Sequence, residues 1–131
     1  EAFKAGAERV VFTKAATLAD SISVGSPRNW AKALRAVRKS DGDMLTVTDE
    51  EILSAIPELA RSTGVFGEPA GATAFAGFRK AAQSGLLGPA DRAAVVVTGN
   101  GLKDIANAQK SAPPALSVAP DLAELERALQ L

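Results

Sequence analysis

A threonine and two glycines follow the most apolar run of the chain. Residues 93–97 read Ala-Ala-Val-Val-Val, and Thr98, Gly99, Asn100 and Gly101 come directly after them. The run predicts a buried strand, because unbroken apolar residues are typical of a parallel-sheet strand covered on both faces. Ligands of such sheets bind beyond the carboxyl ends of the strands, where Thr98 and Gly99 would lie. The hydroxyl could then contact a flat or phosphorylated ligand, and the glycines would let that ligand approach the backbone.

The motif Thr-Gly-Asn-Gly is weak by itself. It is not a Walker loop, because the Gly-Lys-Ser/Thr ending is missing, and it is not the dinucleotide-binding fingerprint, because the third glycine is missing. A plain tight turn after a strand is the alternative interpretation, and the spacing alone favours that alternative.

A carboxylate at the entry to an apolar segment is the second candidate. Glu68 precedes a stretch of Ala, Gly and Phe that predicts a helix over residues 70–84, buried nearly all round. In that helix Gly71 and Gly77 would let another backbone or a ligand come close. A buried carboxylate needs a partner and is typical of functional sites, whereas an exposed one would only be favoured by the helix dipole. The spacing leaves both interpretations of Glu68 open.

The composition excludes several kinds of chemistry. The 131 residues are 47% apolar, carry 15 Lys and Arg against 15 Asp and Glu, and include neither histidine nor cysteine. Disulfides, thiol nucleophiles, Cys/His metal sites and histidine acid–base catalysis are therefore ruled out. Because the charge is balanced and no basic stripe stands out, we expect no nucleic-acid partner. No apolar segment approaches the roughly 20 residues that span a bilayer, so we expect a cytoplasmic protein with no membrane contact.

Strands and helices are expected to alternate around these candidates. Helices are predicted over residues 27–39, 49–62, 70–84 and 121–130, and strands over residues 44–47, 93–97 and 116–118. The helix starts are marked by Pro27, by a capping box from Thr48 to Glu51, and by Asp121, while Pro57 should kink or split the second helix. This order predicts an α/β fold, a three-layer unit in which helices flank an open parallel sheet.

Four stretches taken together resemble threonine synthase. They are Thr17–Trp30, which ends in Pro-Arg-Asn-Trp, Thr48–Leu53, Glu68–Ala72, which reads Glu-Pro-Ala-Gly-Ala, and Val97–Asp104, which reads Val-Thr-Gly-Asn-Gly-Leu-Lys-Asp. Their order and spacing are similar to the C-terminal third of that family over residues 1 to 104 or so. Arg28 and Asn29 belong to the first stretch, although the start of a helix at Ser26-Pro27 explains them at least as well.

The resemblance implies a pyridoxal-phosphate enzyme of the tryptophan-synthase-β fold type. Such an enzyme converts O-phosphohomoserine and water to threonine and phosphate. Thr98 would face the pyridine nitrogen of the cofactor, Glu68 would lie close to the ring, and Gly99 with Asn100 would form the wall beside it. A neutral hydroxyl, unlike a carboxylate, does not force that nitrogen to be protonated and so moderates the electron-sink strength of the ring. The family commonly has His where Asn100 stands.

The resemblance also implies parts of the site that this sequence lacks. The family's Schiff-base lysine and its phosphate-binding loop would lie upstream of Glu1. No lysine of this chain stands in a motif that matches the one around the Schiff-base lysine. Residues Glu1–Gly6 look like the end of a helix with a glycine cap, which fits a fragment. We expect residues 1–131 to be the C-terminal part of the large domain of a two-domain enzyme, inactive alone and a homodimer when full length. Residues 105–131 would be a divergent tail.

A free-standing α/β module is the alternative hypothesis. It would bind a small ligand, such as an anion, at the Thr98 turn, or act as a regulatory domain. Such a module would bind its ligand saturably and would depend on no upstream sequence.

Overall fold

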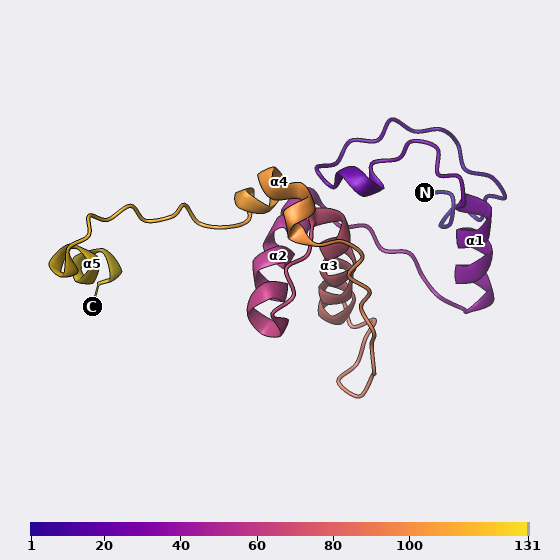
Figure 1. Ribbon diagram of the computed structural model, residues 1–131. Coiled ribbons are helices and arrows are strands. Elements are labelled where there is room, and N and C mark those ends of the chain that lie inside the picture. The colour runs from indigo at the N-terminus through magenta and orange to yellow at the C-terminus, as the bar shows by residue number, and fades with distance from the viewer. Residues whose placement is uncertain (131) are drawn as a thin grey trace.

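Helices make up the regular secondary structure of the computed structural model, which describes residues 1–130 (Figure 1). The α-helices are α1 (Trp30–Lys39), α2 (Asp49–Thr63), α3 (Pro69–Gln83), α4 (Ile105–Lys110) and α5 (Leu122–Leu129). Two short 3-10 helices, η1 (Asp20–Ile22) and η2 (Gly101–Asp104), stand before α1 and α4. No helix among the described residues is both long enough and apolar enough to cross a membrane.

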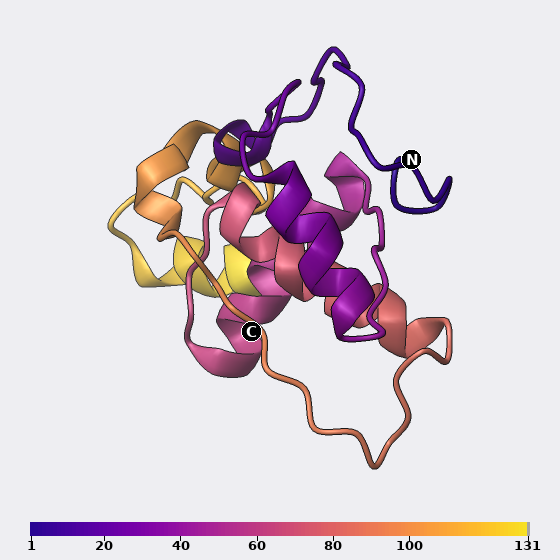
Figure 2. The ribbon, with the colours of Figure 1, turned by 90° about the vertical axis from the view of Figure 1, so that its right-hand side faces the viewer.

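The pair α2 and α3 holds the core. The two helices lie side by side (Figures 1 and 2), and Ile52 and Ala55 of α2 meet Ala76 of α3 and Ala19 of the N-terminal segment in one buried cluster. Phe75 of α3 packs against this cluster from its edge. Alanine at positions 55 and 76 lets the two helices approach closely, and the turn at residues 97–101 lies against the start of α3.

The carboxylate of Asp49 joins the N-terminal segment to α2. It accepts hydrogen bonds from the Thr17 hydroxyl (2.5 Å) and from the Leu18 backbone N–H (3.1 Å). The side-chain amide of Asn107, on α4, donates to the Leu18 carbonyl (3.2 Å). Segments 31 and 89 residues apart in sequence are thereby tied at one end of the α2–α3 pair.

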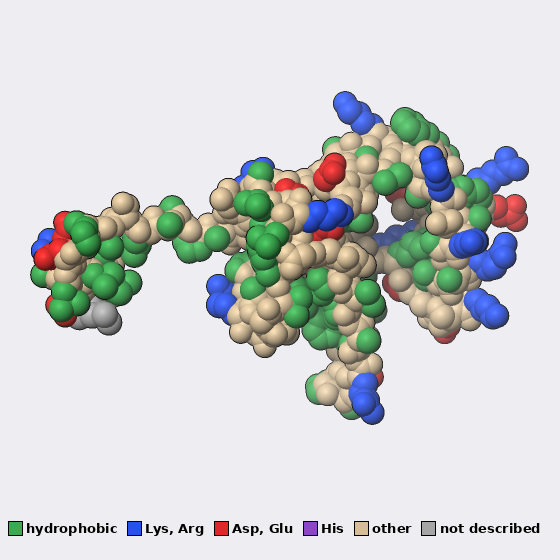
Figure 3. Space-filling view, viewed as in Figure 1, with side chains coloured by type: hydrophobic (Ala, Val, Ile, Leu, Met, Phe, Trp, Pro, Cys, Tyr) green, Lys and Arg blue, Asp and Glu red, His purple; other side chains and the backbone are tan. Residues whose placement is uncertain are grey.

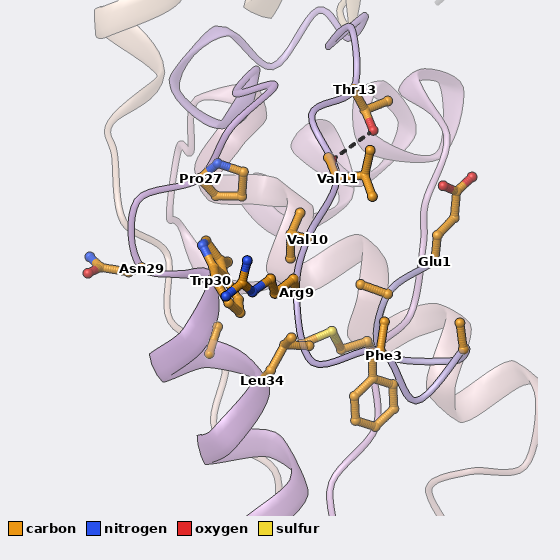
Figure 4. Close-up of a pocket in the computed structure, with 15 residues that line it drawn as sticks. Glu1, Phe3, Arg9, Val10, Val11, Thr13, Pro27, Asn29, Trp30 and Leu34 are labelled. Carbon is orange, nitrogen blue, oxygen red and sulfur yellow. Dashed lines mark hydrogen bonds between the residues drawn. The ribbon is translucent and has the colours of Figure 1, made fainter.

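Helices α1 and α5 lie away from this pair, on opposite sides of it in Figure 1. One face of α1, with Trp30 and Leu34, joins Phe3, Val10 and Met44 of its neighbouring segments around an open apolar groove of about 730 Å³ (Figure 4). Lysine and arginine side chains gather on the side of the molecule where α1 lies (Figure 3), and the four cations of α1 are exposed: Lys32, Arg35, Arg38 and Lys39. Helix α5 follows an extended segment and contributes no buried residue.

The predicted three-layer open parallel sheet is wrong. Residues 44–47, 93–97 and 116–118 are extended but pair with no strand, and within residues 1–130 the β-pairing is one isolated antiparallel bridge between Gly67 and Asn100. Val96 is 70% exposed, and the segment after α3 loops away from the helices in Figures 1 and 2. An apolar run indicates that a segment tends to be buried. A strand forms only where a second strand offers hydrogen-bonding partners.

The helix predictions hold with shifted boundaries. Helix α2 begins and ends within a residue of its prediction, and Pro57 lies inside one continuous helix and does not split it. Helix α1 begins at Trp30, three residues after the predicted start at Pro27. Helix α3 is buried on one side only, because Ala74 is exposed and nothing lies within 4 Å of the place where a Gly77 side chain would stand.

Candidate functional site

The turn after Val97 is held against the start of α3 by backbone hydrogen bonds. The Gly99 carbonyl accepts from the Glu68 N–H (2.9 Å), and the Gly101 N–H donates to the Phe66 carbonyl (2.9 Å). These two bonds flank the Gly67–Asn100 bridge. Thr98 itself is exposed at the outer side of this turn.

Glycine is required here because of close contacts. A Cβ on Gly71, in the first turn of α3, would stand 3.0 Å from both the nitrogen and the oxygen of Gly99. A Cβ on Gly99 would overlap the carboxylate of Glu68, and one on Gly101 would overlap the ring of Phe66. The predicted close approach at Gly71 is thus confirmed, and the neighbour that approaches is the Gly99 backbone.

Glu68 is a buried carboxylate with a charged partner. It is 4% exposed, and its Oε1 lies 3.4 Å from the Nζ of Lys103, whose side chain is 62% exposed. The same ammonium donates to the Ser21 hydroxyl (3.0 Å). A buried carboxylate is tolerated where a cation and hydrogen bonds compensate the lost solvation. Of the two interpretations of Glu68 that the sequence allows, the structure has the buried, partnered one.

Thr98 and Glu68 open onto different hollows of the surface. Thr98 lines a hollow of about 320 Å³ with Gly64, Val65, Phe66, Val97, Gly99 and Asn100. Glu68 lines a polar hollow of about 500 Å³ with Thr17, Leu18, Asp20, Ser21, Lys103, Asp104 and Asn107. Gly99 connects the two, since it lines the first and contacts the Glu68 carboxylate that lines the second.

The other family-motif residues have local structural roles or lie elsewhere. The Asn100 side chain accepts from the Leu102 N–H (2.9 Å) and so caps η2. Arg28 and Asn29 are exposed at the start of α1, and they do not line either of the two hollows. Asn29 directly precedes α1, but its side chain makes no capping hydrogen bond to that helix.

Ser21 and Lys103 lie in stretches that carry the resemblance, but the sequence pattern predicts no role in the site for either residue. The tie from Lys103 to Ser21 spans 82 residues of sequence, and no local pattern encodes a contact of that separation. Within residues 1–130 no group of three or more acidic side chains is placed to hold a metal ion.

Comparison with known proteins shows the family to which this chain belongs. The chain belongs to the family of pyridoxal-phosphate dependent enzymes, whose pattern matches residues 1–99. It is 44% identical to the threonine synthase of Mycobacterium leprae over 97 residues, which are 74% of this chain and 27% of that protein. It is 37% identical to the threonine synthase of Methanocaldococcus jannaschii over 131 residues, which are 99% of this chain and 32% of that protein.

These matches confirm the resemblance that the four sequence stretches indicate. The chain spans about a third or less of the length of the curated relatives it matches. The alignment with the Methanocaldococcus jannaschii protein continues through residues 105–131, whereas the one with the Mycobacterium leprae protein covers 97 residues.

Proposed function

We propose that this chain supplies one wall of the cofactor site of a threonine synthase, which converts O-phosphohomoserine and water to threonine and phosphate. Family membership and the names of the relatives support the reaction. The observation that carries the proposal is the exposed Thr98 hydroxyl beside Gly99, on a turn fixed by two backbone hydrogen bonds.

The donor set of the Thr98 hollow fits the pyridine end of pyridoxal phosphate. Gly64 and Gly99 line this hollow and leave room there for a flat ring, while Val65, Phe66 and Val97 supply apolar side chains to its lining. A neutral hydroxyl can donate a hydrogen bond to a ring nitrogen without adding a charge. When bound, the cofactor supplies an electron sink for carbanions formed on the substrate. Thr98 would bind and orient the ring at its nitrogen, and Gly99 would let the ring approach.

Glu68 acts from behind this wall. Its carboxylate contacts Gly99 from the polar hollow and not from the hollow that Thr98 lines. We therefore place Glu68 close to the ring but assign it to fixing the turn, with Thr98 and Gly99 as the residues that touch the cofactor.

We propose that the chain alone is inactive, because it offers no lysine at the proposed cofactor site. Within the described part of the chain, the hollow beside Thr98 is lined by no lysine, and Lys103 is engaged by Glu68 and Ser21. The lysine that binds the cofactor and the loop that binds its phosphate would come from outside this sequence, and we expect the complete enzyme to be a homodimer.

The test measures threonine and phosphate released from O-phosphohomoserine by the native gene product, with and without pyridoxal phosphate. We expect stoichiometric formation of both products only with the cofactor, and none from the 131-residue chain. Saturable binding of a small anion by the native product, with no turnover, would instead support a free-standing binding module. Turnover by the isolated chain would overturn the assignment of the lysine to another segment.

A further inference from the structure

Lys103 tethers a buried carboxylate from the solvent side. Its Nζ lies between the Oε1 of Glu68 (3.4 Å) and the Oγ of Ser21 (3.0 Å), so one ammonium joins η2, the start of α3 and η1. Asp20 and Asp104 line the same hollow. Without this cation the charged groups that line the hollow would all be carboxylates, and the buried one would lose its charged partner.

The carboxylate of Glu68 lies against the backbone of Gly99. A Cβ there would overlap the Oε1, Cδ and Cγ of Glu68, so the carboxyl group occupies the space next to the Gly99 Cα. On another side, Gly71 of α3 approaches the nitrogen and oxygen of Gly99, and the Glu68 N–H binds the Gly99 carbonyl. Gly99 is therefore held by the first turn of α3 and by a side chain that Lys103 holds.

We propose that Lys103 is a positioning residue for Thr98. Lys103 follows Thr98 by five residues and lies in η2, directly after the turn, so the segment that presents the hydroxyl is followed by its own brace. The brace runs from the ammonium through the Glu68 carboxylate to the Gly99 backbone, and from Gly99 to its neighbour Thr98. Lys103 does not act by touching the ligand of Thr98, because it lines the other hollow.

The proposal rests on the proposed function only for the identity of the ligand. The brace is a property of the chain, and amide hydrogen exchange measures it without cofactor or substrate. The reporters are the N–H groups of Glu68 and Gly101, which donate to the Gly99 and Phe66 carbonyls on either side of the Gly67–Asn100 bridge.

The variants are Lys103→Gln, which removes the charge, and Lys103→Arg, which keeps it. Lys39→Gln, at the exposed end of α1, is the matched control. In Lys103→Gln we expect both reporter amides to exchange about tenfold faster, while amides inside α2 keep their protection, because local opening is independent of global unfolding. Lys103→Arg and Lys39→Gln should stay within about twofold of the parent.

A second arm uses the native gene product loaded with pyridoxal phosphate. For Lys103→Gln we expect kcat to fall by about tenfold with KM for O-phosphohomoserine unchanged, because a misplaced group costs rate more than ground-state binding. Lys103→Arg should restore kcat. Reporter amides that exchange equally in Lys103→Gln and the parent would overturn the brace, and so would an arginine variant no better than the glutamine variant.

The two arms separate the brace from the reaction. If the native product proves inactive on O-phosphohomoserine, the exchange result for Lys103 still stands or fails by itself. If Lys103→Gln does not fold, Ser21→Ala removes only the second partner of the ammonium and should speed exchange at the reporters by about threefold. An unchanged exchange rate in Ser21→Ala would then count against the brace.

Discussion

At the scale of single residues, the site depends on contacts that only glycine allows. Gly99 is not among the glycines with a positive φ, which are Gly6, Gly64 and Gly85. Its backbone is therefore open to any residue, and the restriction is the space that Glu68 occupies. The carboxyl group could swing aside only by leaving Lys103 and its buried position.

Gly99→Ala is expected to destabilise the chain by about 1–3 kcal/mol, which is the usual cost of forcing an extra carbon into a packed place. The measurement is the free energy of unfolding by urea at neutral pH. Gly77→Ala is the control, because its new methyl group would meet nothing within 4 Å. That half-buried helix position has room for the methyl group and should gain up to about 1 kcal/mol from the better helix propensity of alanine. A Gly99→Ala chain as stable as the parent would contradict the contact.

At the scale of elements, the start of α2 depends on a capping box. The Thr48 hydroxyl accepts from the Glu51 N–H (3.2 Å), and the Glu51 carboxylate accepts from the Thr48 N–H (2.6 Å). The hydrogen bond from the Thr48 backbone, and next the nearby Lys80 ammonium, lower the pKa of Glu51 below its ordinary value of 4.5. A lowered pKa means that folding favours the charged form.

This shift fixes the direction of a pH effect. Because the folded pKa lies below the unfolded one, Glu51 stabilises the fold fully above its ordinary pKa of 4.5, and loses that contribution as pH falls through the folded value. The urea midpoint of the parent should therefore fall below pH 4.5 more steeply than that of Glu51→Gln. Parallel curves for the two proteins, measured from pH 6 to about 3, would contradict the capping interpretation.

The elements also show what could be predicted from the sequence and what could not. The Thr48–Glu51 box and Asp121 mark the starts of α2 and α5, because capping is a local interaction between residues three apart. Residues 93–97 misled the fold prediction, since their apolar side chains say nothing about which strand would pair with them. The partnering of Glu68 by Lys103 is likewise non-local, so the sequence could raise its burial only as one of two alternatives.

At the scale of the whole molecule, the helices α2 and α3 carry a short turn that lies between two hollows of the surface. Thr98 faces one hollow, and the Glu68–Lys103 pair faces the other, with Gly99 between them. The extended segments at 93–97 and 116–118 and the amphipathic helix α5 keep large apolar side chains exposed, among them Val96, Leu116, Leu122 and Leu129. Exposed apolar surface of this extent is typical of faces that contact other protein segments.

The central claim is that the Thr98 hydroxyl meets the ring nitrogen of pyridoxal phosphate, and the most direct measurement is the ¹⁵N chemical shift of that nitrogen in the native gene product. With Thr98, and with the conservative variant Thr98→Ser, we predict the shift of an unprotonated pyridine nitrogen, because a neutral hydroxyl adds no charge. In Thr98→Asp, a carboxylate next to the nitrogen should raise its pKa and move the shift to that of the protonated ring. The same shift in all three proteins would contradict the account.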